Sequence, residues 1–119
     1  MMSRLILAAL LALAVAAPTT AQDQAPNRRE FTIVGENFRF APDRIEVSEN
    51  DLVKLTLQSA DQPFTFAIDA YRIVKRTGGG QSIAFEFRAD RPGTFAFYCN
   101  MSADARCKEM RGTLVVNAR

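Results

Sequence analysis

The chain has 119 residues, a formal net charge of +2, two cysteines and no histidine. The nearly balanced charge lacks the clustered basic surface that is typical of proteins that bind nucleic acid. Without histidine, the chain has no Ser–His or Cys–His nucleophile pair and no imidazole-based zinc site, so we predict that it is not an enzyme.

The first 21 residues have the pattern of a secretory signal peptide. Arg4 provides the positive start, residues 5–17 form an apolar run, and residues 18–21 suit cleavage before Gln22. The apolar run is shorter than the ~20 residues that span a bilayer, although an uncleaved N-terminal anchor is the alternative. We therefore predict an exported protein, periplasmic or secreted, that leaves the membrane after cleavage. Residues 22–30 are polar and are expected to form a flexible lead-in.

Residues 31–119 are predicted to form one domain of short β-strands. Val53, Leu55 and Leu57 alternate with polar residues, which is the period of a half-buried strand. Turn residues separate this segment from others of the same kind. The expected segments are 31–34, 38–40 (an edge segment next to a proline), 45–47, 52–58, 64–68, 71–75, 82–88, 95–99 and 112–117. About eight short strands favour an all-β, Greek-key β-sandwich.

Both cysteines and a methionine lie in the connection between the last two predicted strands. Cys99 shares strand parity with the core-facing Phe95 and Phe97, Cys107 follows in the loop, and Met110 precedes the final strand. Two thiols and a thioether are soft ligands that select Cu(I). In an oxidising compartment, an even pair of cysteines favours a disulfide instead. The residues alone leave both interpretations open.

The chain resembles the cupredoxin family along nearly its whole mature length. The resemblance is greatest to periplasmic cupredoxins related to the copper-binding domain of cytochrome oxidase subunit II. It implies that Cys99 and Met110 match ligand positions, whereas Ala103 stands where a second Cys would be. Cys107 replaces the loop His, and Phe64 replaces the upstream His. The segments that carry the resemblance are 40–47, 50–55, 66–71, 89–99 and 110–115.

The missing histidines change what this resemblance implies about function. A binuclear centre is not expected, and a blue-copper site lacks its two imidazoles. One hypothesis is therefore Cu(I) holding or delivery, with Cys99, Cys107 and Met110 as copper ligands and Met101 as a possible substitute. A second is a copper-free structural or interaction domain with a Cys99–Cys107 disulfide, in which Phe64 fills the vacated ligand position.

A third hypothesis is electron transfer with non-standard ligands, for which Asn100, Asp104 or a backbone carbonyl would complete the coordination. The resemblance implies a periplasmic copper or redox protein as the partner. Nothing in the sequence indicates an oligomeric state.

Overall fold

The computed structural model describes residues 27–119, so the predicted signal peptide (1–21) and residues 22–26 of the lead-in lie outside the described part. Nine strands and two short 3-10 helices follow one another along the chain. In order, they are β1 (Arg28–Glu36), β2 (Arg39–Ala41), β3 (Arg44–Ser48), β4 (Leu52–Ser59), β5 (Phe64–Ile68), η1 (Asp69–Tyr71), β6 (Ile73–Thr77), β7 (Ser82–Arg88), β8 (Gly93–Tyr98), η2 (Cys107–Glu109) and β9 (Arg111–Asn117).

Several strand boundaries differ from the sequence prediction by one to three residues, and the starts of β1 and β6 show why. Strand β1 begins at Arg28 rather than at residue 31, because its first residues pair with β4 from Arg28 and Leu52 onward. Residues 28–30 therefore belong to the folded domain and not to a flexible lead-in. Strand β6 begins at Ile73 rather than at residue 71, because η1 and the left-handed Arg72 (φ 55°) precede it.

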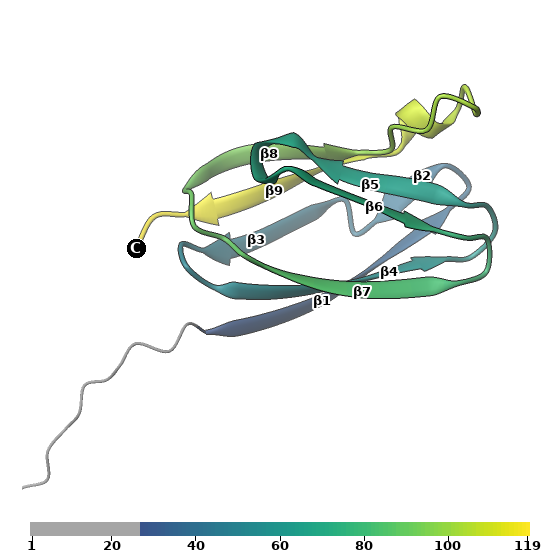
Figure 1. Cartoon of the computed structure of the whole chain (residues 1–119). Helices are drawn as coiled ribbons and strands as arrows, with labels where there is room; N and C mark the ends of the chain where they lie inside the picture. Colours follow the sequence, from purple (N-terminus) through teal and green to yellow (C-terminus); the bar gives the residue numbers. More distant parts are fainter. Residues whose placement is uncertain (1–26) are drawn as a thin grey trace, which may run out of the picture.

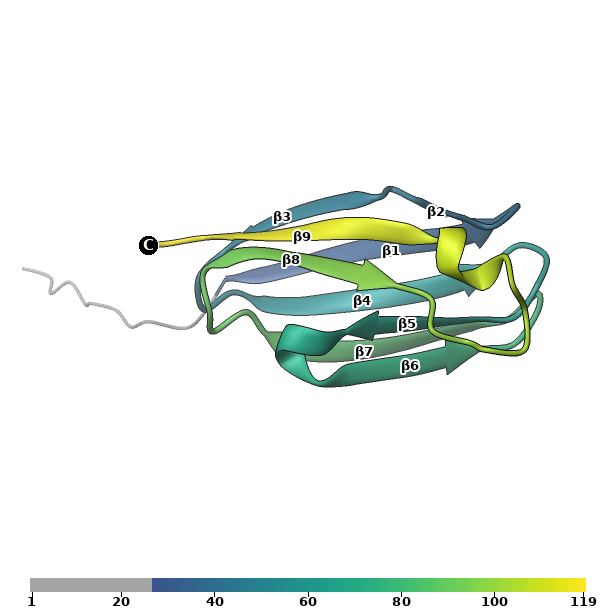
Figure 2. The ribbon, with the colours of Figure 1, turned by 90° about the horizontal axis from the view of Figure 1, so that it is seen from above.

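The strands form two packed sheets, which confirms the predicted all-β sandwich. One sheet has the order β2-β1-β4-β7 and the other the order β3-β9-β8-β5-β6. Figures 1 and 2 show the two layers from the side and from above. Most neighbours are antiparallel, but β1 pairs in parallel with β4, and β3 in parallel with β9. Because β2 and β3 lie in different sheets, the chain crosses between the layers at residues 42–43.

Aromatic side chains fill the space between the sheets. Phe66 lies 4.8 Å from Phe97 and 5.8 Å from Phe40, measured between ring centroids. Each fully buried side chain of this size contributes about 1.5–3 kcal/mol relative to exposure. A Cβ atom at Gly112 would overlap the ring of Phe97, so β9 needs glycine where it passes this ring. The core extends along β8 and β9 to the loop that joins them.

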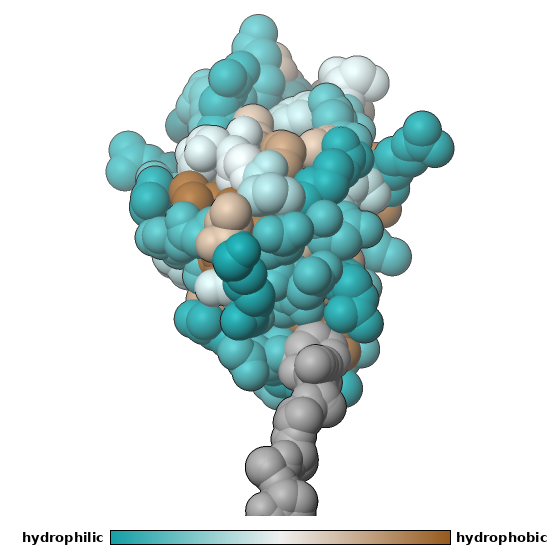
Figure 3. Space-filling view, turned by 90° about the vertical axis from the view of Figure 1, so that its left-hand side faces the viewer, coloured by the Kyte–Doolittle hydropathy of each residue, from teal (hydrophilic) through white to brown (hydrophobic). Residues whose placement is uncertain are grey.

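The two ends of the described chain emerge at the same end of the sandwich, away from η2 (Figure 1). Figure 3 views that end and shows a mostly hydrophilic surface with scattered apolar residues. Among residues 27–119, Val74 is the large hydrophobic side chain that is exposed, at 58%. Within the same residues, no helix is both long and apolar enough to span a bilayer.

Candidate functional site at the disulfide

Cys99 and Cys107 are joined by a disulfide, which is the pairing that the sequence left open as an alternative. Their Cα atoms are 5.3 Å apart, within the usual range for a disulfide. The two residues are only 2% and 3% exposed. No free cysteine remains in residues 27–119. In this state neither sulfur is a thiolate.

Backbone hydrogen bonds connect the disulfide to the predicted ligand Met110. The Cys99 N–H donates to the Met110 carbonyl (3.1 Å), and the Met110 N–H donates to the Cys107 carbonyl (2.9 Å). Cys99 directly follows β8, Cys107 opens η2, and Met110 directly precedes β9. The Met110 side chain is 4% exposed and belongs to the core. The fold therefore brings together all three residues that the sequence singled out.

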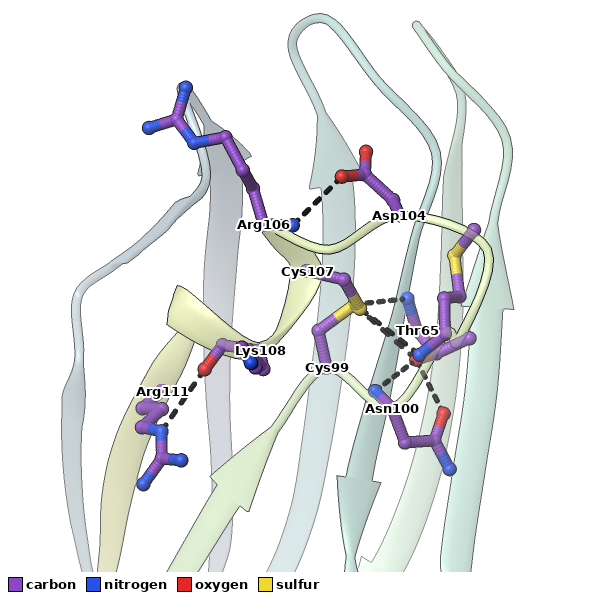
Figure 4. The surroundings of a disulfide bond; sticks show 9 residues. Thr65, Cys99, Asn100, Asp104, Arg106, Cys107, Lys108 and Arg111 are labelled. Carbon is purple, nitrogen blue, oxygen red and sulfur yellow. Dashed lines mark hydrogen bonds between the residues drawn. A yellow bond between two sulfur atoms is a disulfide. The ribbon is translucent and has the colours of Figure 1, made fainter.

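Each sulfur of the disulfide accepts a hydrogen bond from a backbone N–H group. The Thr65 N–H points to Cys99 Sγ (3.4 Å), and the Met101 N–H points to Cys107 Sγ (3.0 Å). Figure 4 shows Thr65 and Asn100 beside the disulfide. Backbone donors stabilise negative charge on an acceptor. The same two N–H groups would therefore favour thiolates if the disulfide were reduced.

The polar side chains near the disulfide are already hydrogen-bonded to local partners. The Thr65 hydroxyl accepts the Asn100 N–H (2.7 Å) and lies 2.6 Å from Asn100 Oδ1. The hydroxyl has a single proton, which it donates to Asn100 Oδ1 over the shorter distance and not to Cys99 Sγ, which is 3.5 Å away. Asp104 Oδ1 accepts the Arg106 N–H at 2.9 Å. Asn100 and Asp104, the additional ligands considered for electron transfer, are thus both engaged, Asn100 with Thr65 of β5 and Asp104 with Arg106 of the loop.

Phe64, which the family resemblance sets against the upstream histidine, is part of the core. The residue is 1% exposed, and its ring centroid lies 5.4 Å from that of Phe40 in an edge-to-face contact. A Cβ atom on Gly35 of β1 would overlap the Phe64 ring. The residue that precedes Thr65 is therefore a tightly packed apolar ring that offers no nitrogen ligand.

The donors present in this state do not fit a copper ion. Within the described part of the chain, no group of three or more His, Cys, Asp or Glu residues could hold a metal. The bonded sulfurs of Cys99 and Cys107 lack the negative charge of thiolate ligands. Two thiolates and the Met110 thioether would form a soft donor set after reduction, and that set suits Cu(I).

Sequence reasoning missed the contact of Thr65 with the disulfide, the turn at Asn37 and Phe38, and the role of Asp61 in holding that turn. Asp61 accepts the N–H groups of Asn37 (2.9 Å) and Gln62 (2.6 Å). These two backbone bonds lower the pKa of Asp61 below its usual value. Nothing in the sequence indicated which distant segment contacts the turn at residues 37–38.

A shallow hollow of about 730 Å³ lies over the β3, β9 and β8 strands of the larger sheet. Its lining includes Tyr98 and Arg111, the sequence neighbours of Cys99 and Met110. The Tyr98 hydroxyl donates to Asp69 Oδ1 (2.8 Å), and this carboxylate raises the pKa of Tyr98. Arg44, Arg111 and Asp43 give the lining both signs of charge, so the hollow favours no charge class of ligand.

Solved copper proteins share this fold. Auracyanin A, a "blue" copper protein from Chloroflexus aurantiacus, is 18% identical with a TM-score of 0.65, over 76% of this chain and 100% of that protein. The multicopper oxidase mgLAC is 22% identical with a TM-score of 0.66, over 77% of this chain but 39% of the oxidase.

A third solved structure is the metal-binding domain of the Cu(I)-exporting P-type ATPase CopA of Streptococcus pneumoniae D39, with Cu(I). It is 18% identical with a TM-score of 0.63, over 73% of this chain and 83% of that domain. At these identities the likenesses establish the fold. The comparison with curated proteins gave no match.

The sequence itself matches the family of cupredoxin-like domains over residues 5–116. This match spans most of the chain and agrees with the two-sheet fold and with the resemblance noted from residues 40–115. The chain therefore belongs to the family of cupredoxin-like domains.

Proposed function

We propose that the protein is an exported cupredoxin-like module that binds Cu(I) when its disulfide is reduced and is copper-free when its disulfide is closed. The observation that carries this proposal is that both disulfide sulfurs, Cys99 Sγ and Cys107 Sγ, accept backbone N–H bonds. A purely structural disulfide does not require such donors. A thiolate does benefit from them, because each bond lowers the pKa of the thiol.

The proposed opening step is a two-electron reduction. A dithiol reductant transfers two electrons and two protons to the Cys99–Cys107 bond, which breaks to give two thiols, while the reductant forms its own disulfide. Each thiol then releases its proton as Cu(I) is bound. The resulting thiolates and the Met110 thioether are the proposed ligands, and they hold Cu(I) in a soft, largely apolar site.

Without imidazole, this donor set disfavours Cu(II), so we infer a role in holding or delivering copper rather than in cycling electrons. We also infer that the module is not an enzyme and acts outside the cytoplasm, where export would place it. Its partner would be a periplasmic copper or redox protein that supplies reducing equivalents or receives the metal.

A second candidate function is a copper-free interaction domain with a permanent disulfide. The burial of Cys99 and Cys107 and the packing of Phe64 against Phe40 favour it, because both features stabilise the closed state. The two candidates differ in one measurable property, which is copper uptake after reduction.

The test combines thiol titration with metal analysis on protein purified from the periplasm. As purified, the protein should show no free thiols and no copper. After anaerobic reduction, it should show two thiols and take up about one colourless Cu(I) per chain in competition with a Cu(I) chelator. Met110→Leu should keep both thiols and bind Cu(I) more weakly. Two free thiols without Cu(I) uptake would reject the proposal in favour of the copper-free domain.

A companion variant tests whether the loop retains the geometry of a metal scaffold. Cys107→His would restore the nitrogen ligand that the family resemblance places there and would remove the disulfide. A visible absorption band on adding Cu(II) to this variant, but not to Cys107→Ser, would support a metal-binding origin for the loop. Equal spectra for the two variants would count against it.

A further inference from the structure

The turn between β1 and β2 holds an aromatic residue in an unfavourable backbone conformation. Asn37 and Phe38 have φ angles of 54° and 59°, both in the left-handed region. Asn tolerates this region, and Gly is the preferred residue at the second central position of such hairpin turns, where Phe38 stands here. A bulky side chain there is strained by its own Cβ and is uncommon. Something beyond the turn must therefore hold Phe38 in place.

The compensating contact lies on the loop that carries the disulfide. The Arg106 guanidinium sits 4.2 Å from the centroid of the Phe38 ring. Its Nε and Nη2 atoms also face Glu109 Oε1, at 3.4 and 3.3 Å. Arg106 immediately precedes Cys107 and stands at the N-terminal boundary of η2. The Phe38 ring is partly buried against the core, so it provides a firm support for this segment.

The turn is fixed from its other side by the segment that leads into β5. Asp61 accepts the Asn37 N–H, and the Ala60 N–H donates to the Gly35 carbonyl (3.0 Å). Four residues after Asp61, Thr65 donates its N–H to Cys99 Sγ. Both cysteines are therefore linked by a series of contacts to the turn at Asn37 and Phe38. Cys99 is linked to Asn37 through Thr65 and Asp61 of one segment. Cys107 is linked to Phe38 through its neighbour Arg106.

We propose that Phe38 is a positioning residue that keeps the loop closed over the disulfide and thereby sets the rate at which a dithiol reductant reaches the Cys99–Cys107 bond. Reduction begins when a reductant thiolate attacks one sulfur, breaks the S–S bond and forms a mixed disulfide. The second reductant thiol then displaces the protein sulfur and leaves two cysteine thiols. Attack requires a local opening, because both cysteines are almost fully buried.

This inference deepens the proposed function, because it names what controls the opening of the same site, but it rests only on the disulfide. The test measures the rate of disulfide reduction by dithiothreitol in the folded protein, with no copper present. Phe38→Gly relieves the backbone strain and removes the support for Arg106. We expect its reduction to be at least about tenfold faster, with little change in the urea midpoint, because strain relief offsets lost packing.

Two further variants separate positioning from general destabilisation. Phe38→Tyr keeps the ring and should reduce at the wild-type rate. Phe31→Ala removes an aromatic ring of β1 that Arg29 faces at 5.9 Å and that precedes the turn at Asn37 and Phe38. It should lower the urea midpoint without accelerating reduction beyond its effect on global unfolding. A Phe38→Gly rate that is unchanged, or that rises only in proportion to the unfolding constant, would overturn the inference.

The outcome is distinguishable from failure of the proposed function. If the reduced wild-type protein binds no Cu(I), the copper proposal fails while the reduction rates stay interpretable. If the protein as purified carries two free thiols, the disulfide premise fails and this inference falls with it.

Discussion

Opening the Cys99–Cys107 bond should destabilise the domain by a predictable amount. The two cysteines are separated by 8 positions in the sequence. In the chain-entropy model, closing a loop of this size stabilises the folded state by about 2.5 kcal/mol. For a domain of this size, that difference corresponds to a fall in Tm of about 10–20 °C.

The assay is urea unfolding of the oxidised and the reduced protein, followed by circular dichroism, with a chelator present to exclude metal. On reduction, the urea midpoint should fall by ~2.5 kcal/mol divided by the m-value of the unfolding curve. The double variant Cys99→Ser/Cys107→Ser is the control, because its unfolding curve should not respond to reductant. Coincident curves for the oxidised and reduced wild-type protein would refute this reasoning, because they would mean that the bond does not constrain the unfolded chain.

Four further predictions concern residues away from the sulfurs. Asp51 is fully buried, accepts the Ser48 N–H and faces two arginines, so Asp51→Asn should cost about 1–3 kcal/mol in urea unfolding. Gly112→Ala should cost about 1–3 kcal/mol by overlap with a buried ring. Gly80→Ala has open space and should cost only about 1 kcal/mol through its φ of +71°. The pKa of Asp61 is lowered by two backbone N–H groups, so its contribution to stability is complete above the ordinary carboxyl pKa of about 3.9 and is lost as the pH falls below that value. The free energy of unfolding of Asp61→Asn should therefore fall less than that of the wild-type protein as the pH is lowered through this range. Identical acid-unfolding profiles for the two proteins would contradict this prediction.

The fold was predictable because its strands obey the two-residue period closely. In β4, the inward positions Val53, Leu55 and Leu57 are all buried, as their alternation predicted. The same parity argument placed Cys99 inward at the end of β8, which is also correct. Local patterns of this kind depend on neighbouring residues, so a single sequence contains them.

The details of the site were less predictable because they depend on contacts between distant residues. Thr65 appears in the sequence as an ordinary β-branched strand residue, yet its hydroxyl meets Asn100, which is 35 positions away. The predicted extended segment 38–40 includes Phe38, and its left-handed turn conformation is unexpected because aromatic residues rarely adopt it. The choice between thiols and a disulfide was open because spacing alone does not set the redox state of a cysteine pair.

The position of the chain ends has a practical consequence for experiments on this domain. Strand β9 starts beside Met110 and ends at Asn117, seven residues later, a distance of roughly 23 Å along the strand. Strand β1 starts at that same far end (Figure 1). A purification tag, a surface linker or a fused reporter at either end of the described chain would therefore sit away from the disulfide. An immobilised domain would present its cysteine loop to the solution, ready for kinetic measurement with a soluble reductant or partner.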